Sequence, residues 1–180
     1  MPEQHSGESI SIMRVQPREP AGVILRSESQ GVDGRLDERH SALGGNLSPP
    51  LEWDPVIDAR AWAIIVEDPD APRDLPFLHW MAWDIPGEVT TLPQGLSNDA
   101  HPLSVHGMIQ GRNDNGSYGW FGPKPPPGHG VHHYHFQIFA LDGPLGLGAD
   151  SPLEALIGAL KGHTLAEGQL VATFEAPATQ

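Results

Sequence analysis

The sequence predicts an all-β or β-rich domain, built from many short strands that are joined by turns. Glycine and proline are abundant, with 21 and 19 residues among 180, and both favour turns over long helices. Hydrophobic residues make up 38% of the chain and charged residues 18%, which is a folded rather than a disordered composition. The length suits one domain with its own core. We therefore expect a flexible tail over residues 1–8 and a single domain over 9–180.

The N-terminal third carries strand patterns of unequal strength. Weak patterns predict strands at 9–15, from 23 to 25, and within a loop at 31–43. In the segment 46–53, NLSPPLEW, two prolines enforce extended or turn geometry, and Leu51 and Trp53 point to one side. This segment is either a surface turn that is anchored by one buried tryptophan or part of a binding wall.

Two stronger strands follow in the middle of the chain. Residues 61–66, AWAIIV, are apolar and partly β-branched, which predicts a strand that is buried on both faces. Residues 79–85 predict the next strand, and the two-residue period of a strand puts four side chains on one face: His79, Met81, Trp83 and Ile85. A short strand is also expected within 105–110.

The one clear helix is expected near the C-terminus, at about 152–161. Ser151 as N-cap, Pro152 at the first helical position and Glu154 form a capping box, and Gly162 suits the C-cap. An apolar stripe for packing on a sheet is formed by Leu153, Leu156, Ile157 and Leu160. A last strand is expected at about 169–175.

Charge and composition exclude several functional classes. The formal net charge is −13 with only 10 Lys and Arg residues, a field that repels nucleic acid and anionic membrane surfaces. The chain has no cysteine, which removes disulfides, thiol nucleophiles and cysteine zinc sites. The N-terminus lacks the features of a signal peptide, and no apolar run reaches membrane-spanning length. We therefore expect a cytoplasmic protein that binds no nucleic acid and has no stable membrane insertion.

The first segment with chemical potential is Asp68–Pro72, DPDAP. Taken alone, it is typical of a tight turn in which aspartates cap their own backbone. His79 follows within one loop, at the start of the next strand. A strand end, a loop and a strand start can meet at one pocket rim, so the segment is either a turn or half of a site.

The second segment is Gly111–Asp142, in which a loop rich in glycine and proline leads into a strand rich in histidine. Four histidines gather there, at 129, 132, 133 and 135. Strand alternation puts His132 and Tyr134 on one face and His133 and His135 on the other. The four therefore cannot share one metal, although a set such as His132, His79 and Asp68 remains an alternative.

The interpretation that we favour is an anion pocket formed by both segments. The side chains of His79, His132 and Tyr134 can donate hydrogen bonds to a phosphate or carboxylate. Backbone N–H groups of Gly119–Gly122 can serve the same anion. Asp68 and Asp70 can orient the imidazoles or share a proton with a bound phosphate monoester. No serine, cysteine or lysine is placed as an activated nucleophile, which favours binding over covalent catalysis.

These segments resemble the phosphatidylethanolamine-binding protein family, also called the Raf kinase inhibitor protein family, in its compact bacterial and archaeal branch. The matching segments occur in the family order and span Ile10 to Phe174: Asn46–Trp53, Asp68–Pro72, His79-Trp80, Gly111–Asp114, Gly122-Pro123 through Pro126-Pro127, and Gly130–Tyr134. The resemblance implies a Greek-key β-sandwich of two antiparallel sheets with a small anion pocket.

Position by position, the resemblance implies a set of ligand-binding residues: Asp68, Asp70, Pro72, His79, Gly122, Pro126, His132 and Tyr134. By the same resemblance, the bond between Ala71 and Pro72 is a candidate cis peptide, which the sequence itself cannot show. Phe77 replaces the tryptophan that usually precedes the pocket histidine, and His133 replaces an arginine. The rim has extra prolines, so Pro123, Pro125 and Pro126 are alternatives for one position.

The expected function is non-catalytic binding of a small anionic ligand: phosphate, acetate, a phospholipid head group, a phosphorylated small molecule or a phosphopeptide. A regulatory role is left open. The resemblance offers a second hypothesis, inhibition of a kinase or protease through the pocket rim. A third is a metal-dependent enzyme with a cupin-like barrel that uses the histidine cluster. The first two hypotheses need no metal or cofactor, and the resemblance leaves a homodimer open.

Overall fold

Two antiparallel β-sheets and one α-helix form the regular structure of residues 10–18 and 22–178, the part of the chain that the computed structural model describes. The small sheet has the strand order β1-β2-β5, and the large sheet has the order β6-β4-β3-β7-β8. The predicted β-rich sandwich of two antiparallel sheets with one helix is confirmed. The expected tail over residues 1–8 lies outside the described residues.

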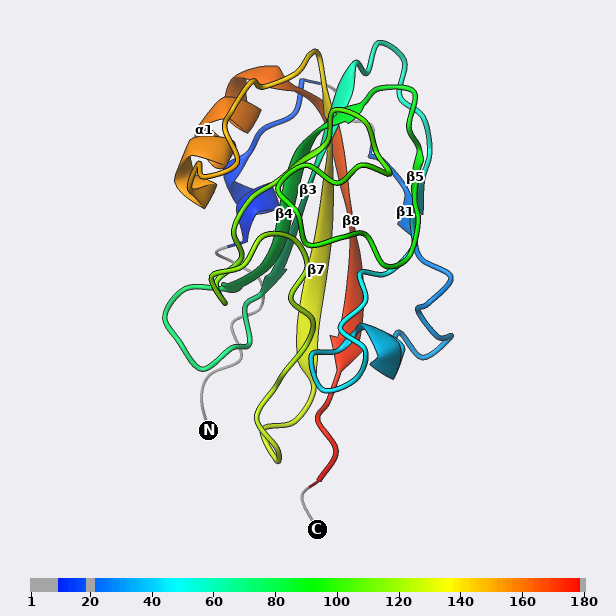
Figure 1. The fold of residues 1–180 in the computed structure, drawn as a ribbon, viewed down its shortest axis with the longest axis vertical. Coiled ribbons are helices and arrows are strands. Elements are labelled where there is room, and N and C mark those ends of the chain that lie inside the picture. The colour runs from blue at the N-terminus through cyan, green and yellow to red at the C-terminus, as the bar shows by residue number, and fades with distance from the viewer. Residues whose placement is uncertain (1–9, 19–21, 179–180) are drawn as a thin grey trace.

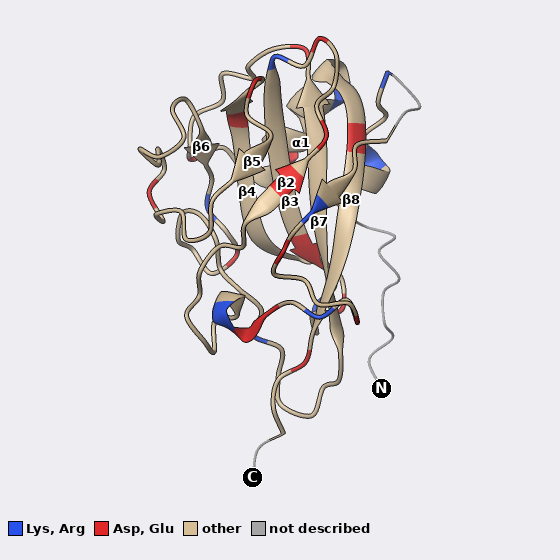
Figure 2. Cartoon of the chain, turned by 90° about the vertical axis from the view of Figure 1, so that its right-hand side faces the viewer, with Lys and Arg blue, Asp and Glu red and all other residues tan. Residues whose placement is uncertain are grey.

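The small sheet covers one face of the large sheet, and the helix covers the other (Figure 1). We call these the inner face and the outer face. The small sheet consists of β1 (Leu25–Arg26), β2 (Leu51–Trp53) and β5 (Thr91–Leu92). Figure 2 shows it in front of the long strands. The large sheet consists of β3 (Ala61–Asp68), β4 (Phe77–Pro86), β6 (Ile109–Gln110), β7 (His132–Leu141) and β8 (Thr164–Phe174).

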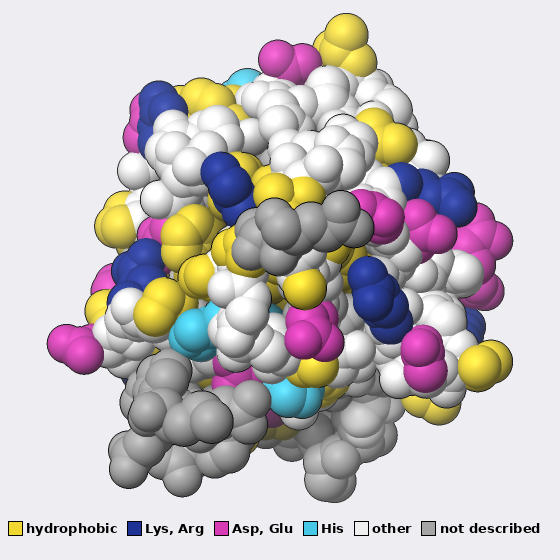
Figure 3. Space-filling model, turned by 90° about the horizontal axis from the view of Figure 1, so that it is seen from below, with side chains coloured by type: hydrophobic (Ala, Val, Ile, Leu, Met, Phe, Trp, Pro, Cys, Tyr) yellow, Lys and Arg dark blue, Asp and Glu magenta, His cyan; other side chains and the backbone are white. Residues whose placement is uncertain are grey.

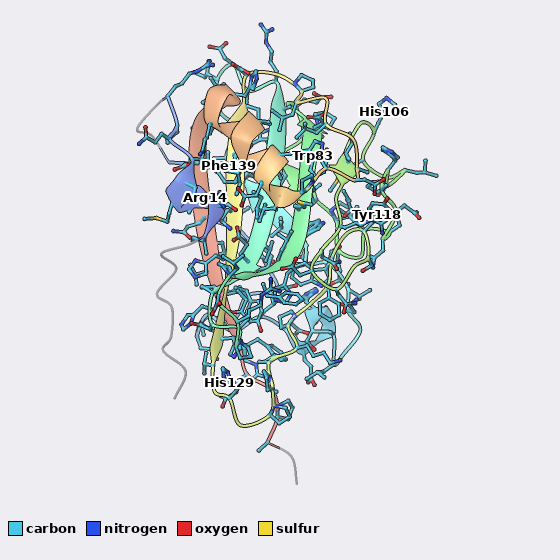
Figure 4. All side chains as sticks on the ribbon, turned by 90° about the vertical axis from the view of Figure 1, so that its left-hand side faces the viewer. Arg14, Trp83, His106, Tyr118, His129 and Phe139 are labelled. Atoms are coloured by element: carbon cyan, nitrogen blue, oxygen red, sulfur yellow. The ribbon has the colours of Figure 1, made fainter. Side chains whose placement is uncertain are left out.

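The core has two layers because β3 is apolar on both faces, and all eight of its residues are buried. The inner layer is aromatic, and the Trp120 ring lies 5.8 Å from Trp80, edge to face, and 5.8 Å from Phe136, stacked, between ring centroids. The outer layer contains Trp83 and Phe139 beside α1 (Leu153–His163), as Figure 4 shows. The expectation of a central strand without a solvent face is therefore confirmed.

Two predicted strands near the N-terminus are wrong. Residues Ser11–Arg14 form a short 3-10 helix, η1, which lies on the outer face where Ser11 donates hydrogen bonds to Glu67. The stretch 31–43 contains a second 3-10 helix, η2 (Glu38–His40), and isolated bridges, but no strand. In both places polar contacts to a distant strand replace the regular ladder that a weak alternation suggested.

The predicted face of 79–85 is also wrong, because β4 carries two irregularities in its pairing with β3. Met81 and Trp83 lie in the outer layer, whereas Ile85 lies in the inner layer. The ladder shifts between Trp62 and Ile64, opposite Asp84, whose φ of 54° is in the left-handed region. A bulge changes which face the following residues use, and simple alternation cannot anticipate it.

The helix is found, but its caps differ from the prediction. Pro152 is the N-cap and has no side-chain cap bond. The Glu154 carboxylate accepts hydrogen bonds from Arg14 at 2.9 and 2.6 Å instead of folding back on the helix. Gly162 lies inside the helix, and Thr164 is the C-cap, with its hydroxyl donating to the Leu160 carbonyl at 2.7 Å. The predicted stripe is confirmed by buried Leu156, Ile157 and Leu160.

Candidate functional site

A pocket of about 390 Å³ lies at the lower end of the large sheet, on its inner face. Six of the eight residues predicted as ligand-binding line it: Asp68, Pro72, His79, Pro126, His132 and Tyr134. They come from the end of β3, the start of β4, the start of β7 and the proline-rich loop. Seen from below, this end of the molecule shows histidine side chains among hydrophobic ones (Figure 3).

His79 enters the pocket because it is an extra residue in β4. Val66 pairs with Trp80 and Glu67 with Leu78, so His79 has no partner across the ladder. The two-residue period is broken there, and His79 shares the inner face with Tyr134, whose ring centroid is 5.1 Å away. A bulge that aims one side chain into a site is a recurrent use of this irregularity.

His79 is held in one orientation by Phe121. The ring Nδ1 lies 2.6 Å from the Phe121 carbonyl oxygen, which can only accept, so Nδ1 carries the hydrogen. The Phe121 N–H donates to the His79 carbonyl at 2.9 Å. The residue is 3% exposed, and this burial lowers the pKa of His79 to about 4. The imidazole is therefore neutral at pH 7, and its Nε2 is an acceptor.

Asp68 and His132 form the second polar pair of the pocket. His132 Nδ1 donates to Asp68 Oδ2 at 2.7 Å, and both residues are buried. Asp68 Oδ1 also accepts the Asp70 N–H at 2.7 Å. Asp68 thus orients a pocket imidazole, as expected from the sequence.

Asp70 has a different position from the one that the sequence suggested. Its carboxylate accepts the His133 N–H at 2.9 Å and lies 2.7 Å from His133 Nδ1. Asp70 does not line the pocket. It fastens the DPDAP loop to the start of β7 and orients the outward imidazole rather than a pocket one.

Tyr134 presents its phenol to the pocket. Burial, and then the carboxylates of Asp68 and Asp70, raise the pKa of Tyr134 above its ordinary value. The hydroxyl therefore remains protonated at physiological pH and can donate to a ligand. His132 and Tyr134 are both buried, whereas His133 and His135 are half-buried, so the predicted alternation of this strand is confirmed.

Three of the four N–H groups of the turn Gly119–Gly122 are already bonded within the protein. Gly119 donates to Gly111, Phe121 donates to His79, and Gly122 donates to the Asn46 side chain at 2.8 Å. Gly122 lies behind the pocket wall, where an added Cβ would be 1.9 Å from the His40 carbonyl oxygen. Glycine is needed there because two backbones approach closely.

Of the three alternative rim prolines, two line the pocket. Pro125 and Pro126 line the pocket, whereas the Pro123 carbonyl accepts a hydrogen bond from the Ala42 N–H at 2.9 Å. The candidate cis peptide between Ala71 and Pro72 is not found, since the described residues contain no cis bond.

Sequence reasoning missed several residues of the pocket wall: Arg73, Asn115, Phe121 and Lys124. Arg73 follows the DPDAP segment directly and pairs with Asp114 at 3.2 Å. Lys124 is the only lysine or arginine of the rim loop 119–131. A lone cation in a loop of glycine and proline was the available signal.

His129 also has a role that alternation could not reveal, because it precedes the strand. Its Nδ1 lies 2.6 Å from His132 Nε2, so both ring nitrogens of His132 are hydrogen-bonded. Figure 4 shows His129 at the lower tip of the molecule. No group of three or more His, Cys, Asp or Glu residues suited to a metal occurs within 10–18 and 22–178.

Comparison with known proteins decides the family. The family model described as phosphatidylethanolamine-binding protein matches residues 26–175. The chain belongs to the phosphatidylethanolamine-binding protein family. A UPF0098 protein of Pyrococcus abyssi is 41% identical over 146 residues, which cover 81% of this chain and 81% of that protein. A UPF0098 protein of Methanothermobacter thermautotrophicus is 40% identical over 151 residues, which cover 83% of this chain and 97% of the relative.

Solved structures of the family have the same fold. Escherichia coli YbcL, described as a member of the mammalian family, superposes with a TM-score of 0.79 at 30% identity and covers 87% of this chain and 100% of its own. A phosphatidylethanolamine-binding protein homologue from Chlamydia trachomatis has a TM-score of 0.76 at 29% identity, with coverage of 87% and 99%. In the part of the chain that is described, no helix is long and apolar enough to cross a membrane.

Proposed function

We propose that this chain is a non-catalytic binding protein for a small anion of the phosphate monoester type. One observation carries the proposal: the pocket brings the neutral donor Tyr134 together with the cations Arg73 and Lys124 around two fixed imidazoles. A phosphate group presents three acceptor oxygens to such donors. The volume of about 390 Å³ suits a head group or small metabolite.

The absence of a nucleophile supports binding over catalysis. No serine, threonine or cysteine is among the described residues that line the pocket. The lysine of the wall, Lys124, is an exposed rim residue rather than a buried amine in an apolar pocket, which is the setting that activates a lysine nucleophile. A regulatory role would follow from occupancy of the pocket and not from turnover.

The two tyrosines of the chain allow a matched test. Tyr134→Phe removes one hydroxyl from the pocket and should weaken methyl phosphate binding about tenfold, because one hydrogen bond to a charged group is lost. Isothermal titration calorimetry at pH 5.5 measures the change. Tyr118 lies away from His129 and the lower end (Figure 4), with its hydroxyl bonded to Asp150.

Tyr118→Phe is the control and should leave the affinity within twofold of the unmodified protein. Circular dichroism checks that both variants fold. Equal affinities of the two variants, or no heat from methyl phosphate with the unmodified protein, would refute the proposed function.

A further inference from the structure

The polar wall of the pocket contains acceptors as well as donors, which is unusual for an anion site. His79 Nδ1 is committed to the Phe121 carbonyl at 2.6 Å, so Nε2 is the ring nitrogen that a ligand can reach. In a neutral imidazole with hydrogen on Nδ1, Nε2 offers a lone pair and no hydrogen. The tautomer therefore follows from the contact with Phe121.

A proton is not readily added to this imidazole. The His79 ring lies against three aromatic rings, Phe77 at 4.7 Å, Tyr134 at 5.1 Å and Phe121 at 6.1 Å between centroids. Such burial disfavours the cation, in agreement with the lowered pKa of His79. The charged and titratable groups near it are Asp68, Asp114, His132 and Tyr134, and Arg73 and Lys124 share the pocket.

Asp68 adds a second acceptor to the same wall. An ionised carboxylate has about four lone-pair positions and no hydrogen. Asp68 uses two of its positions, for the Asp70 N–H and for His132 Nδ1. An anion with no hydrogen would place its lone pairs against those of His79 Nε2 and Asp68, which is repulsive.

Donors lie elsewhere on the wall. The Tyr134 hydroxyl keeps its hydrogen, Asn115 carries an amide, and Arg73 and Lys124 carry positive charge. The pocket therefore has one part that accepts hydrogen and another that donates it. A ligand matches both parts only if it has ionised oxygens and also an O–H group.

We propose that the pocket selects an anion that carries its own hydrogen, namely the singly ionised form of a phosphate monoester, over anions of equal charge without one. The ligand P–O–H donates to His79 Nε2, and the ionised oxygens accept from Tyr134 and lie toward Arg73 and Lys124. This inference rests on the proposed function and narrows its ligand class. No bond forms or breaks in this binding.

A comparison of methyl phosphate with methyl sulfate tests the role of the ligand O–H group, because the two anions have similar shape and, at pH 5, the same charge. At pH 5 methyl phosphate is mostly a monoanion with one O–H, since the second pKa of a phosphate monoester is about 6. Methyl sulfate is a monoanion of similar shape without an O–H. Calorimetric titration of the unmodified protein at pH 5, in cationic buffer free of phosphate, sulfate and carboxylates, should show at least tenfold tighter binding of methyl phosphate.

The pH dependence gives a second readout. Methyl phosphate loses its hydrogen above pH 6, so its affinity should fall about a hundredfold between pH 5 and 8. Methyl sulfate does not titrate in this range, so its profile reports the protein groups alone and corrects for them. Equal affinities at pH 5, or methyl phosphate affinity that rises with pH, would overturn the inference and leave the proposed function intact. If neither anion binds, the proposed function itself fails.

His79→Gln tests the residue that we hold responsible. A glutamine amide can turn either an N–H or a carbonyl toward the ligand, so the preference for methyl phosphate should fall below twofold. A thermal melt establishes that the variant folds. An unchanged preference in a folded variant would contradict the role of His79.

Discussion

Strand β3 ends in two consecutive acids, Glu67 and Asp68, that are equally buried but lie on opposite faces of the large sheet. Each is 3% exposed, and each contacts a side chain of β7: Glu67 meets Gln137 at 3.2 Å on the outer face, and Asp68 meets His132 at 2.7 Å on the inner face. Their positions in the sequence differ by one residue, yet only Asp68 belongs to the pocket.

The difference lies in what the polar atoms contact. Glu67 Oε1 accepts hydrogen bonds from the Ser11 N–H, the Ser11 hydroxyl and Gln137, and Gln137 accepts the Ile12 N–H at 2.6 Å. This network fastens η1 to the outer face. On the inner face, His79 and Tyr134 present polar atoms to a cavity. A buried acid marks a site only when the chain leaves polar atoms nearby for a ligand.

The two faces also respond to pH in opposite directions. Burial raises the pKa of Glu67, so its contribution to stability is present at low pH and is lost as pH rises through the folded-state pKa. Burial lowers the pKa of His79 from 6.5 to about 4. Between pH 6.5 and about pH 4, His79 binds a proton in the unfolded chain but not in the folded chain. The unfolding free energy therefore falls as the pH falls through this range.

The largest expected effect is therefore acid destabilisation through His79. Its shift corresponds to about 3 kcal/mol of unfolding free energy that is lost between pH 7 and pH 4. Urea denaturation of the unmodified protein and of His79→Gln, at several pH values, measures it. Between pH 7 and pH 4 the unmodified protein should lose about 3 kcal/mol more unfolding free energy than His79→Gln loses. If the unfolding free energies of the two proteins fall in parallel with pH, His79 does not carry the effect.

The second effect tests the outer face. Glu67→Ala leaves the Ser11 N–H, the Ser11 hydroxyl and Gln137 without their acceptor, which should lower the unfolding free energy by about 2 kcal/mol. Methyl phosphate affinity should stay within twofold, because the pocket is on the other face. Glu52→Ala on β2 removes an exposed carboxylate, 62% accessible, and is the control with little effect. A large loss of affinity in Glu67→Ala would contradict the separation of the two faces.

The smallest effect concerns the pair of Asp70 and His133. His133 is 43% exposed at its side chain, and its backbone N–H contact to Asp70 survives truncation. We expect His133→Ala to change stability by less than about 0.5 kcal/mol and affinity by less than twofold. Urea denaturation and calorimetry check both values. A tenfold loss of affinity would place the Asp70 pair in the ligand site after all.

Patterns of two or three residues predicted much of this molecule. The apolar run of 61–66 gave a doubly buried strand, and alternation after Val131 correctly turned His132 and Tyr134 inward. The pocket wall was less accessible to such reasoning. Arg73 and Lys124 lie in loops whose path depends on long-range contacts, such as the Gly122 N–H to Asn46.

Features set by distant partners escaped the sequence altogether. Glu154 suits a capping box, but Arg14, 140 positions earlier, binds it instead. The turn Gly119–Gly122 looked free to bind an anion, but three of its four N–H groups donate to acceptors of Gly111, His79 and Asn46. Local preference gives way where a tertiary partner offers a stronger bond.

The bulge in β4 makes His79 an insertion into an otherwise regular ladder. Val66 with Trp80 and Glu67 with Leu78 would remain paired in a chain that lacked this one residue. Leu78 packs in the outer hydrophobic layer and Trp80 in the inner one, whereas the His79 imidazole belongs to neither layer. Deletion of His79 should therefore keep the pairs Val66–Trp80 and Glu67–Leu78 in register and remove only the imidazole from the pocket wall.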